Sequence, residues 1–233
     1  MVEIIPAINS ETFEEVRDKI RKVEPYAKWA HLDIADGTFT PNTLWHNSLD
    51  LVGFKTNLNL EIHMMEDAPE ERIDHWFLPP VKRIIVHWET VRDLDFIIEE
   101  CHKEKIEVGL AIADSTSWIK LKPYIDPVRG KTPEVSAAPL ARASNGVNKV
   151  DMLQVLCVPA GRAGQEFHAH NLLKIKHLRK ICPHCTIEVD GGINLETAKK
   201  SVEMGANVIA AASYIFSSKD IKKVIEELQN LAD

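Results

Sequence analysis

The chain has 233 residues, of which 45% are hydrophobic and 27% are charged, as is usual for a globular domain. Its formal net charge of −7 argues against nucleic acid or an anionic membrane as the main partner. No apolar run approaches the roughly 18 residues that span a membrane. The opening segment MVEIIPAINSETFEE lacks the basic and then apolar pattern of a secretory signal, so we expect a cytoplasmic protein.

Short β-rich segments alternate with longer amphipathic segments along the chain. Apolar and β-branched runs predict strands over residues 3–8, 27–35, 58–65, 83–88, 107–113, 152–158, 186–192 and 207–213. Helical spacing of apolar residues predicts helices over residues 12–23, 91–105, 171–181, 194–205 and 219–231. Shorter helices are expected after the second, third and fifth strands. Eight such units favour a (β/α)8 TIM barrel that forms a single domain over residues 1–233.

Residues 127–148 interrupt this alternation with repeated Pro and Gly and without a sustained period. They lie between the fifth helix and the sixth strand. In a barrel this connection lies on the face opposite the active site. We therefore expect this irregular insertion to have a structural, interface or disordered role rather than a catalytic one.

The motif CPHC at residues 182–185 has the CxxC spacing of zinc and redox sites. A zinc ribbon needs a second cysteine pair, which the chain lacks, and the motif does not open a helix as thioredoxin-like motifs do. We expect reduced cysteines in a connecting loop.

Polar residues alternate with apolar residues near the carboxyl ends of three predicted strands. Because side chains two apart share a face of a strand, three polar pairs point into the barrel: His31 with Asp33, Glu61 with His63, and Glu188 with Asp190. His31, Asp33, His63 and Asp190 fall where barrel active sites lie. Two imidazoles and two carboxylates suit a divalent zinc, iron(II), manganese or cobalt ion, and this ligand set does not choose among them. A buried ion-pair network without a metal is the alternative.

Four segments resemble signature segments of the ribulose-phosphate 3-epimerase family: HLDIADGTFTPN (31–42), EIHMM (61–65), VPAGRAGQ (158–165) and IEVDGGINLETAKKSVEMGANVIAAASYIF (187–216). The resemblance runs from IPAINSETF near the start to SYIF near the end. It implies a metal-dependent isomerase that inverts C3 of a ketose phosphate, D-ribulose 5-phosphate to D-xylulose 5-phosphate above all. It also implies a sugar-phosphate partner, a place in the pentose phosphate pathway and a homo-oligomeric state.

The resemblance also implies roles for individual residues. The positions of the four metal ligands are those of His31, Asp33, His63 and Asp190, and the positions of the two acid/base carboxylates are those of Asp33 and Asp190. The substrate-binding positions are those of Ser10, Met65, Gly161, Arg162 and Gly164. The backbone cradle for the substrate phosphate corresponds to Gly191, Gly192, Ile193, Ala212 and Ser213, at the loops where phosphate binds in many barrels.

This chemistry explains why two carboxylates are needed. Inversion at a carbon next to a ketone requires a base on one face to remove the proton and an acid on the other face to return one. The intermediate is an enediolate, and a divalent metal can stabilise its negative charge. Nothing resembling a GxGxxG fingerprint indicates a nicotinamide or flavin cofactor.

The chain departs from the family pattern around the substrate. Ala35 and Leu156 stand where the family has methionines, Arg162 replaces an aromatic residue, and Ala163 and Ala212 replace glycines. These changes bear on specificity, because packing at the pocket positions the substrate. As a cation, Arg162 could bind a substrate phosphate or carboxylate, or it could simply be solvated.

Three functions stay open at this point. The first is the epimerase, the second is the same chemistry on a six-carbon ketose phosphate, and the third is a non-catalytic barrel that binds sugar phosphate or metal. Related decarboxylase and synthase barrels use an Asp-x-Lys-x-x-Asp element, for which DIAD (33–36) offers no lysine. His87 and Trp88 are expected in the pocket wall or core, and His168 and His170 are expected in solvent.

Overall fold

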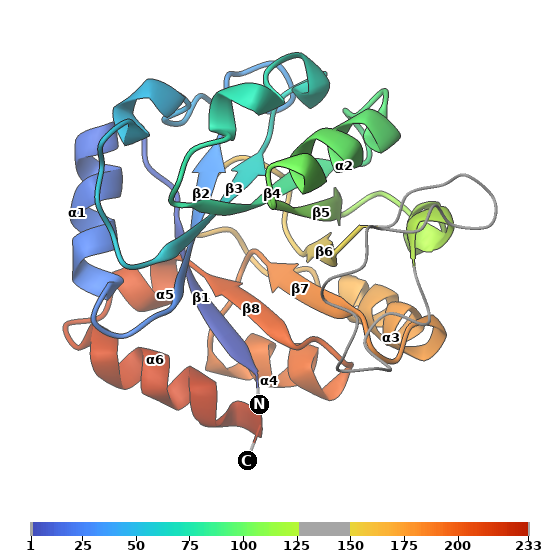
Figure 1. Cartoon of the computed structure of the whole chain (residues 1–233). Helices are drawn as coiled ribbons and strands as arrows, with labels where there is room; N and C mark the ends of the chain where they lie inside the picture. Colours follow the sequence, from blue (N-terminus) through green and yellow to red (C-terminus); the bar gives the residue numbers. More distant parts are fainter. Residues whose placement is uncertain (1, 126–149, 233) are drawn as a thin grey trace, which may run out of the picture.

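Eight parallel strands close into a barrel in which each strand pairs with its neighbours in sequence and β1 pairs with β8 (Figure 1). The computed structural model describes residues 2–125 and 150–232. The strands are β1 Glu3–Ile8, β2 Trp29–Ile34, β3 Asn59–Met64, β4 Val81–His87, β5 Glu107–Ile112, β6 Met152–Leu156, β7 Thr186–Asp190 and β8 Val208–Ala211. All eight predicted strands and the TIM-barrel class are confirmed.

The α-helices lie around the outside of the barrel (Figure 1). They are α1 Phe13–Val23, α2 Leu94–Lys103, α3 Leu172–Ile181, α4 Leu195–Glu203, α5 Ser213–Phe216 and α6 Ile221–Gln229. The five longer helices confirm the predicted ones. After β2, β3 and β5 the chain instead forms 3-10 turns: η1 Ser48–Leu51, η2 Pro69–Glu71, η3 Ile73–Trp76 and η4 Trp118–Tyr124. The α-helices expected there are therefore wrong in kind, and Pro123 inside η4 removes a backbone donor that an α-helix needs.

Side-chain caps determine where several helices begin. The Thr12 side chain accepts a hydrogen bond from the Glu15 N–H at the start of α1. The Asp93 side chain accepts one from the Phe96 N–H at the start of α2. Asn194 and Thr197 form a reciprocal capping box at α4. These caps fix the points at which the chain leaves each strand-to-helix loop on the catalytic side of the barrel.

Both faces of the strands are buried, as in most parallel barrels. The main apolar core lies between the barrel and the helices and includes Leu32 and Ile34 of β2. Ile85, Ala111 and Met152 form a separate apolar cluster on the inward faces of β4, β5 and β6. The alternation that sends apolar residues of β2 outward sends its polar residues inward, as the sequence predicts.

Two of the sequence expectations concern irregular segments. The predicted insertion at 127–148 lies outside the described residues. CPHC lies in the loop between α3 and β7, as expected, but Cys182 and Cys185 form a disulfide, so the expectation of reduced thiols is wrong. Their Cα atoms are 5.5 Å apart, which is within the usual span of a disulfide. No helix in the described ranges is long and apolar enough to cross a membrane.

The interior cluster offers a test of the fold. Met152 is 1% exposed and contacts Ile85 and Ala111. We expect Met152→Ala to lower the free energy of unfolding by about 2–5 kcal/mol, because it leaves a cavity where the barrel cannot collapse. Urea unfolding measures this, with Leu173→Ala on the exposed face of α3 as a control expected to change stability by less than about 0.5 kcal/mol. Equal changes in the free energy of unfolding for the two substitutions would contradict the placement of Met152 in the barrel interior.

Candidate active site

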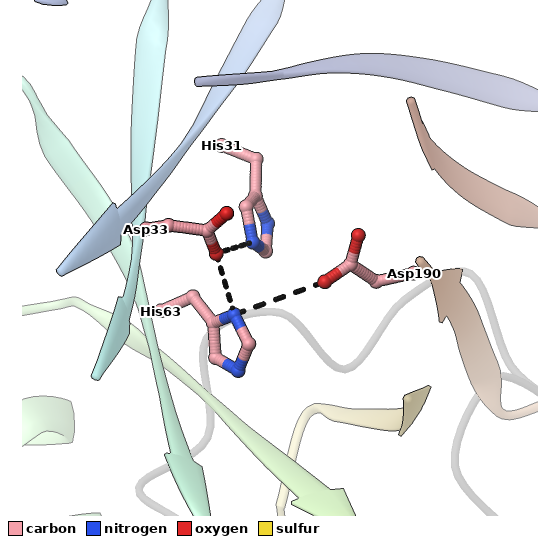
Figure 2. Close-up of side chains that lie close together, drawn as sticks. All are labelled: His31, Asp33, His63 and Asp190. Atoms are coloured by element: carbon pink, nitrogen blue, oxygen red, sulfur yellow. Dashed lines mark hydrogen bonds and ion pairs between the residues drawn. The ribbon is translucent and has the colours of Figure 1, made fainter. Parts of the chain in front are cut away.

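Two histidines and two aspartates meet at the carboxyl ends of β2, β3 and β7 (Figure 2). Asp33 Oδ1 lies 3.2 Å from His31 Nε2 and 2.8 Å from His63 Nδ1. Asp190 faces them from the other side of the opening, with Oδ2 3.9 Å from His63 Nδ1. One ligand atom from each residue lies within 4.8 Å of the others. The structure thus brings together all four predicted metal ligands.

The donor set fits a divalent metal ion. Two imidazole nitrogens and two carboxylate oxygens suit zinc, iron(II), manganese or cobalt. The other nitrogen of each ring is held by a neighbour: His31 Nδ1 lies 2.8 Å from Glu61 Oε1, and His63 Nε2 lies 2.8 Å from His87 Nε2. Such partners fix the tautomer and orientation of metal-binding histidines. The cluster could therefore hold a metal ion.

His87, which contacts His63, is itself held by Glu89. Its Nδ1 lies 3.2 Å from Glu89 Oε2, and the His63 and His87 rings stack with centroids 5.0 Å apart. Burial acts to raise the pKa of Glu89, but hydrogen bonds from His87, Thr116 and the Ala113 N–H lower it to about 2. An ionised Glu89 favours a proton on His87 Nδ1, so that His87 Nε2 accepts from His63 Nε2. With a metal ion bound, this arrangement would present the lone pair of His63 Nδ1 on the side of the two aspartates, in place of the hydrogen bond to Asp33.

His87 was expected only in the pocket wall or core, and its place behind a metal ligand was missed. The spacing in VHWE (86–89) could have indicated the His87–Glu89 contact, because residues two apart in a strand share a face.

A second buried network supports His31. Glu61 accepts hydrogen bonds from His31 through one oxygen and from Arg83 through the other, at 2.8 and 2.6 Å. Gln154 Nε2 donates to Glu188 Oε1, and that oxygen also lies 3.6 Å from His31 Nδ1. Burial and the nearby charge of Glu61 raise the pKa of Glu188 well above its usual range, so this carboxyl group keeps its proton.

The two aspartates have opposite electrostatic environments. Burial acts to raise the pKa of Asp33, but hydrogen bonds from His31 and His63 hold it well below its usual range. Burial raises the pKa of Asp190 to about 7, and repulsion from Asp33 adds to the shift. Near neutral pH, Asp33 is ionised while Asp190 can carry a proton. A pair separated in this way suits one base and one acid.

A cavity of about 470 Å³, open solvent at its mouth included, lies over the cluster. The predicted residues that line it are Asp33, His63, Met65, Gly161, Arg162, Gly164, Asp190, Gly191, Gly192, Ile193, Ala212 and Ser213. His31 is fully buried behind Asp33 and does not line the cavity. Ser10 does not line it either: its hydroxyl accepts a hydrogen bond from Lys19 at 2.9 Å.

Asn9, which the sequence analysis did not single out, lies in the cavity wall beside Ser10. Its Nδ2 donates to Asp33 Oδ2 at 2.9 Å and to the Gly161 carbonyl at 3.0 Å. Asn9 therefore links a carboxylate of the cluster to the segment 158–165, which we call the lid segment. No sequence pattern indicated this link, because the two contacts lie far from Asn9 along the chain.

The lid segment covers one side of the cavity and is closely fitted at Gly161. Gly161 has φ of 119°, and a Cβ there would lie 2.3 Å from Asn42 Oδ1, so only glycine fits. Gln165 Nε2 donates to the carbonyls of Pro159 and Arg162, both at 2.7 Å, and closes the segment on itself. Arg162 is exposed and lines the cavity mouth.

The predicted phosphate cradle lies at the carboxyl ends of β7 and β8. Within the described part of the chain, no protein atom accepts a hydrogen bond from the N–H of Gly192 or Ile193. Gly192 has φ of 67°, and a Cβ there would lie 2.7 Å from the Phe167 backbone. Ala212 has a negative φ of −101°, so the position does not require the left-handed conformation that favours glycine. Backbone N–H groups without protein partners make this turn suitable for an anion.

The residues that depart from the family pattern pack beside the cluster. Ala35 is buried with Leu44 and Met65, and Phe39 packs against this group. Neighbouring apolar side chains therefore fill the Met65 side of the pocket even though Ala35 is small. On the β6 side, Leu156 lines the cavity.

Comparison with known proteins relates this site to one family. The ribulose-phosphate 3 epimerase family matches the chain over residues 3–130 and 133–216. The ribulose-phosphate 3-epimerase of Schizosaccharomyces pombe is 29% identical over 97% of this chain and 92% of its own length. Its counterparts in Chlamydia muridarum and Bacillus subtilis are 30% and 27% identical, over 94% and 98% of this chain and 90% and 99% of their own lengths.

Solved structures with the same fold are more distant in sequence. The 3-hexulose-6-phosphate synthase of Salmonella typhimurium is 15% identical, with a TM-score of 0.63 over 98% of this chain and 97% of that one. The phosphoribosyl anthranilate isomerase of Thermococcus kodakaraensis is 13% identical, with a TM-score of 0.61 over 100% and 99% of the two chains. At these identities the likeness establishes the barrel alone.

Asn9 gives a test of how the lid segment is held. Asn9→Ala removes the side-chain hydrogen bonds to Asp33 and to the Gly161 carbonyl. At about 1 kcal/mol for a hydrogen bond, we expect amide exchange in residues 158–165 to become about fivefold faster. Hydrogen-exchange mass spectrometry measures this, with Asn57→Ala on an exposed loop as the control. Unchanged exchange in Asn9→Ala would show that Asn9 does not hold the segment.

Proposed function

Because the chain belongs to the ribulose-phosphate 3 epimerase family, a family of carbohydrate epimerases, we propose that it inverts C3 of a ketose phosphate, D-ribulose 5-phosphate and D-xylulose 5-phosphate above all. The observation that carries the proposal is the pair Asp33 and Asp190. They face one another across a single cavity, and their pKa values are shifted in opposite directions. A protein that only binds a sugar phosphate has no need of two opposed proton carriers.

In the proposed reaction the two aspartates exchange one proton with each face of C3. Asp33 removes the proton from one face, and we assign this step to Oδ2, which accepts a hydrogen bond from Asn9, because Oδ1 contacts both His31 and His63. Asp190, with a pKa of about 7, returns a proton to the other face. The enediolate lies between the two steps, and the aspartates exchange roles in the reverse direction.

The remaining residues bind and orient the substrate. The N–H groups at Gly192 and Ile193, with the turn at Ala212 and Ser213, are the proposed cradle for the phosphate. A divalent zinc, iron(II), manganese or cobalt ion held by the four-residue cluster would supply Lewis-acid stabilisation of the developing negative charge. Arg162 at the mouth is proposed as an additional cation for the phosphate.

A six-carbon ketose phosphate is the second candidate substrate. Leu156, which lines the cavity, is shorter and branched where the family pattern has a methionine, so the shape of the pocket differs on the β6 side. The proposal also retains a cytoplasmic location and a homo-oligomeric state. Among the relatives, one from Oryza sativa is named a cytoplasmic isoform and one from Arabidopsis thaliana is named chloroplastic.

Deuterium exchange tests the chemistry. Metal-loaded protein incubated with D-ribulose 5-phosphate in D2O is expected to place deuterium at C3, measured by NMR. Asp33→Asn and Asp190→Asn should each slow this exchange by about a thousandfold, because each removes one of the two proton carriers. Asp74→Asn on the exposed η3 turn is the matched control and should leave the rate unchanged.

The outcomes distinguish the candidates. Exchange on a six-carbon ketose phosphate and none on D-ribulose 5-phosphate would replace the first substrate by the second. Absence of exchange on either substrate would contradict the epimerase and favour a binding protein.

Metal removal tests the cofactor. We expect treatment with a chelator to slow C3 exchange by about a thousandfold, since a Lewis acid contributes several kcal/mol to stabilisation of the transition state. Re-addition of zinc, iron(II), manganese or cobalt, one at a time, should restore the rate and rank the metals. Full activity in protein shown by elemental analysis to be metal-free would eliminate the metal from the mechanism.

A further inference from the structure

The loops that follow β5 and β6 bring three metal-binding side chains together outside the cavity. Asp114 lies just after β5, and His168 and His170 lie at η5 (Ala169–Asn171), before α3. His168 Nδ1 lies 3.1 Å from Asp114 Oδ2, and His170 Nε2 lies 3.1 Å from Asp114 Oδ1. The rings are partly exposed, as expected, but they converge on one carboxylate rather than standing alone in solvent.

The spacing of these atoms suits a metal ion. One ligand atom from each residue lies within 4.8 Å of the others. Ligands about 2.0–2.1 Å from a tetrahedral zinc ion lie about 3.3 Å from one another, which is close to the two observed distances. Imidazole-rich sets select zinc and other divalent transition ions over magnesium or calcium, which prefer oxygen.

A buried amide holds the carboxylate of this cluster in place. Asn171 is fully buried, and its Nδ2 donates to Asp114 Oδ1 at 2.6 Å. Hydrogen-bond partners of this kind orient the carboxylates that bind metal ions.

The backbone around the cluster is held in place. Lys174 Nζ donates to the carbonyls of Ala113 and Asp114, at 3.1 and 2.6 Å. The His168 N–H donates to the Cys157 carbonyl at 2.8 Å, which fixes the end of the loop that contains the lid segment. These contacts fix the backbone on both sides of the cluster.

We propose that Asp114, His168 and His170, with Asn171 holding the Asp114 carboxylate, form a second site for a divalent transition-metal ion such as zinc. The site lies outside the cavity and is separate from the proposed catalytic cluster. Its role is structural: it joins the end of β5 to the residues that follow the lid segment. Phe167, adjacent to His168, packs on Gly192 in the proposed phosphate cradle, so the site would stabilise the position of that contact.

Metal stoichiometry tests the proposal. Metal-free full-length protein is titrated with Zn²⁺ by calorimetry and with Co²⁺ by visible absorption at about pH 7.5, where free imidazoles are neutral. We expect two equivalents in the unmodified protein and one in His170→Ala, with affinity at the second site reduced by at least about tenfold. His170 is 60% exposed in its side chain, so this variant should fold normally. His75→Ala removes an exposed histidine elsewhere and should keep two equivalents.

His63→Ala separates the second site from the catalytic cluster. We expect one equivalent in His63→Ala and none in the double variant His63→Ala/His170→Ala. If the catalytic cluster holds no metal, the equivalent lost in His170→Ala is the only one observed, and the second site still stands. If His170→Ala keeps the stoichiometry and affinity of the unmodified protein, or if no equivalent survives His63→Ala, the second site is eliminated.

Discussion

The candidate site depends on a buried ion pair between Glu61 and Arg83. The interior of a closed parallel barrel excludes water, so an ionised group there needs a partner. Arg83 donates to one oxygen of Glu61 at 2.6 Å, and the other oxygen, 2.8 Å from His31 Nδ1, fixes that ring. The orientation of His31 in turn directs its Nε2 at Asp33. The geometry at the mouth of the barrel therefore begins with charge pairing in its interior.

Carboxylates outnumber cations inside the barrel, and this imbalance separates their pKa values. Asp33 and Glu61 have partners that keep their pKa low, whereas burial raises the pKa of Glu188 and brings that of Asp190 to about 7. In the pair Glu61 and Glu188, Glu61 stays ionised and Glu188 holds a proton. In the pair Asp33 and Asp190, Asp33 stays ionised and Asp190 can hold a proton. The excess of buried acid is also what makes a divalent cation favourable at the mouth, where His31 and the three other residues of the cluster converge.

The barrel and the cluster followed from sequence because they depend on local patterns. Period-two alternation places His31 and Asp33 on the inward face of β2, and the position at the strand end places them at the mouth. The residues that support the site make contacts between strands, and no local sequence pattern indicates these contacts. Asn9 reaches the Gly161 carbonyl 152 positions away, and the His63–His87 contact requires the register of two strands. The 3-10 turn η4 was missed because apolar spacing predicted a helix there, whereas Pro123 inside it removes a backbone donor. The Cys182–Cys185 disulfide was missed because it depends on the distance between the two thiols, which the sequence does not show.

The lid segment is held near its middle and just beyond its end, which limits how it can move. The Gly161 carbonyl accepts hydrogen bonds from Asn9 and Asn42, at 3.0 and 3.5 Å. Beyond the end of the segment, Phe167 packs on the backbone at Gly192. Within the segment, Gln165 donates to the carbonyls of Pro159 and Arg162, so the segment forms one closed turn rather than an extended loop. Because the backbone on both sides of Arg162 is held in place, movement at the mouth is confined mainly to the exposed Arg162 side chain.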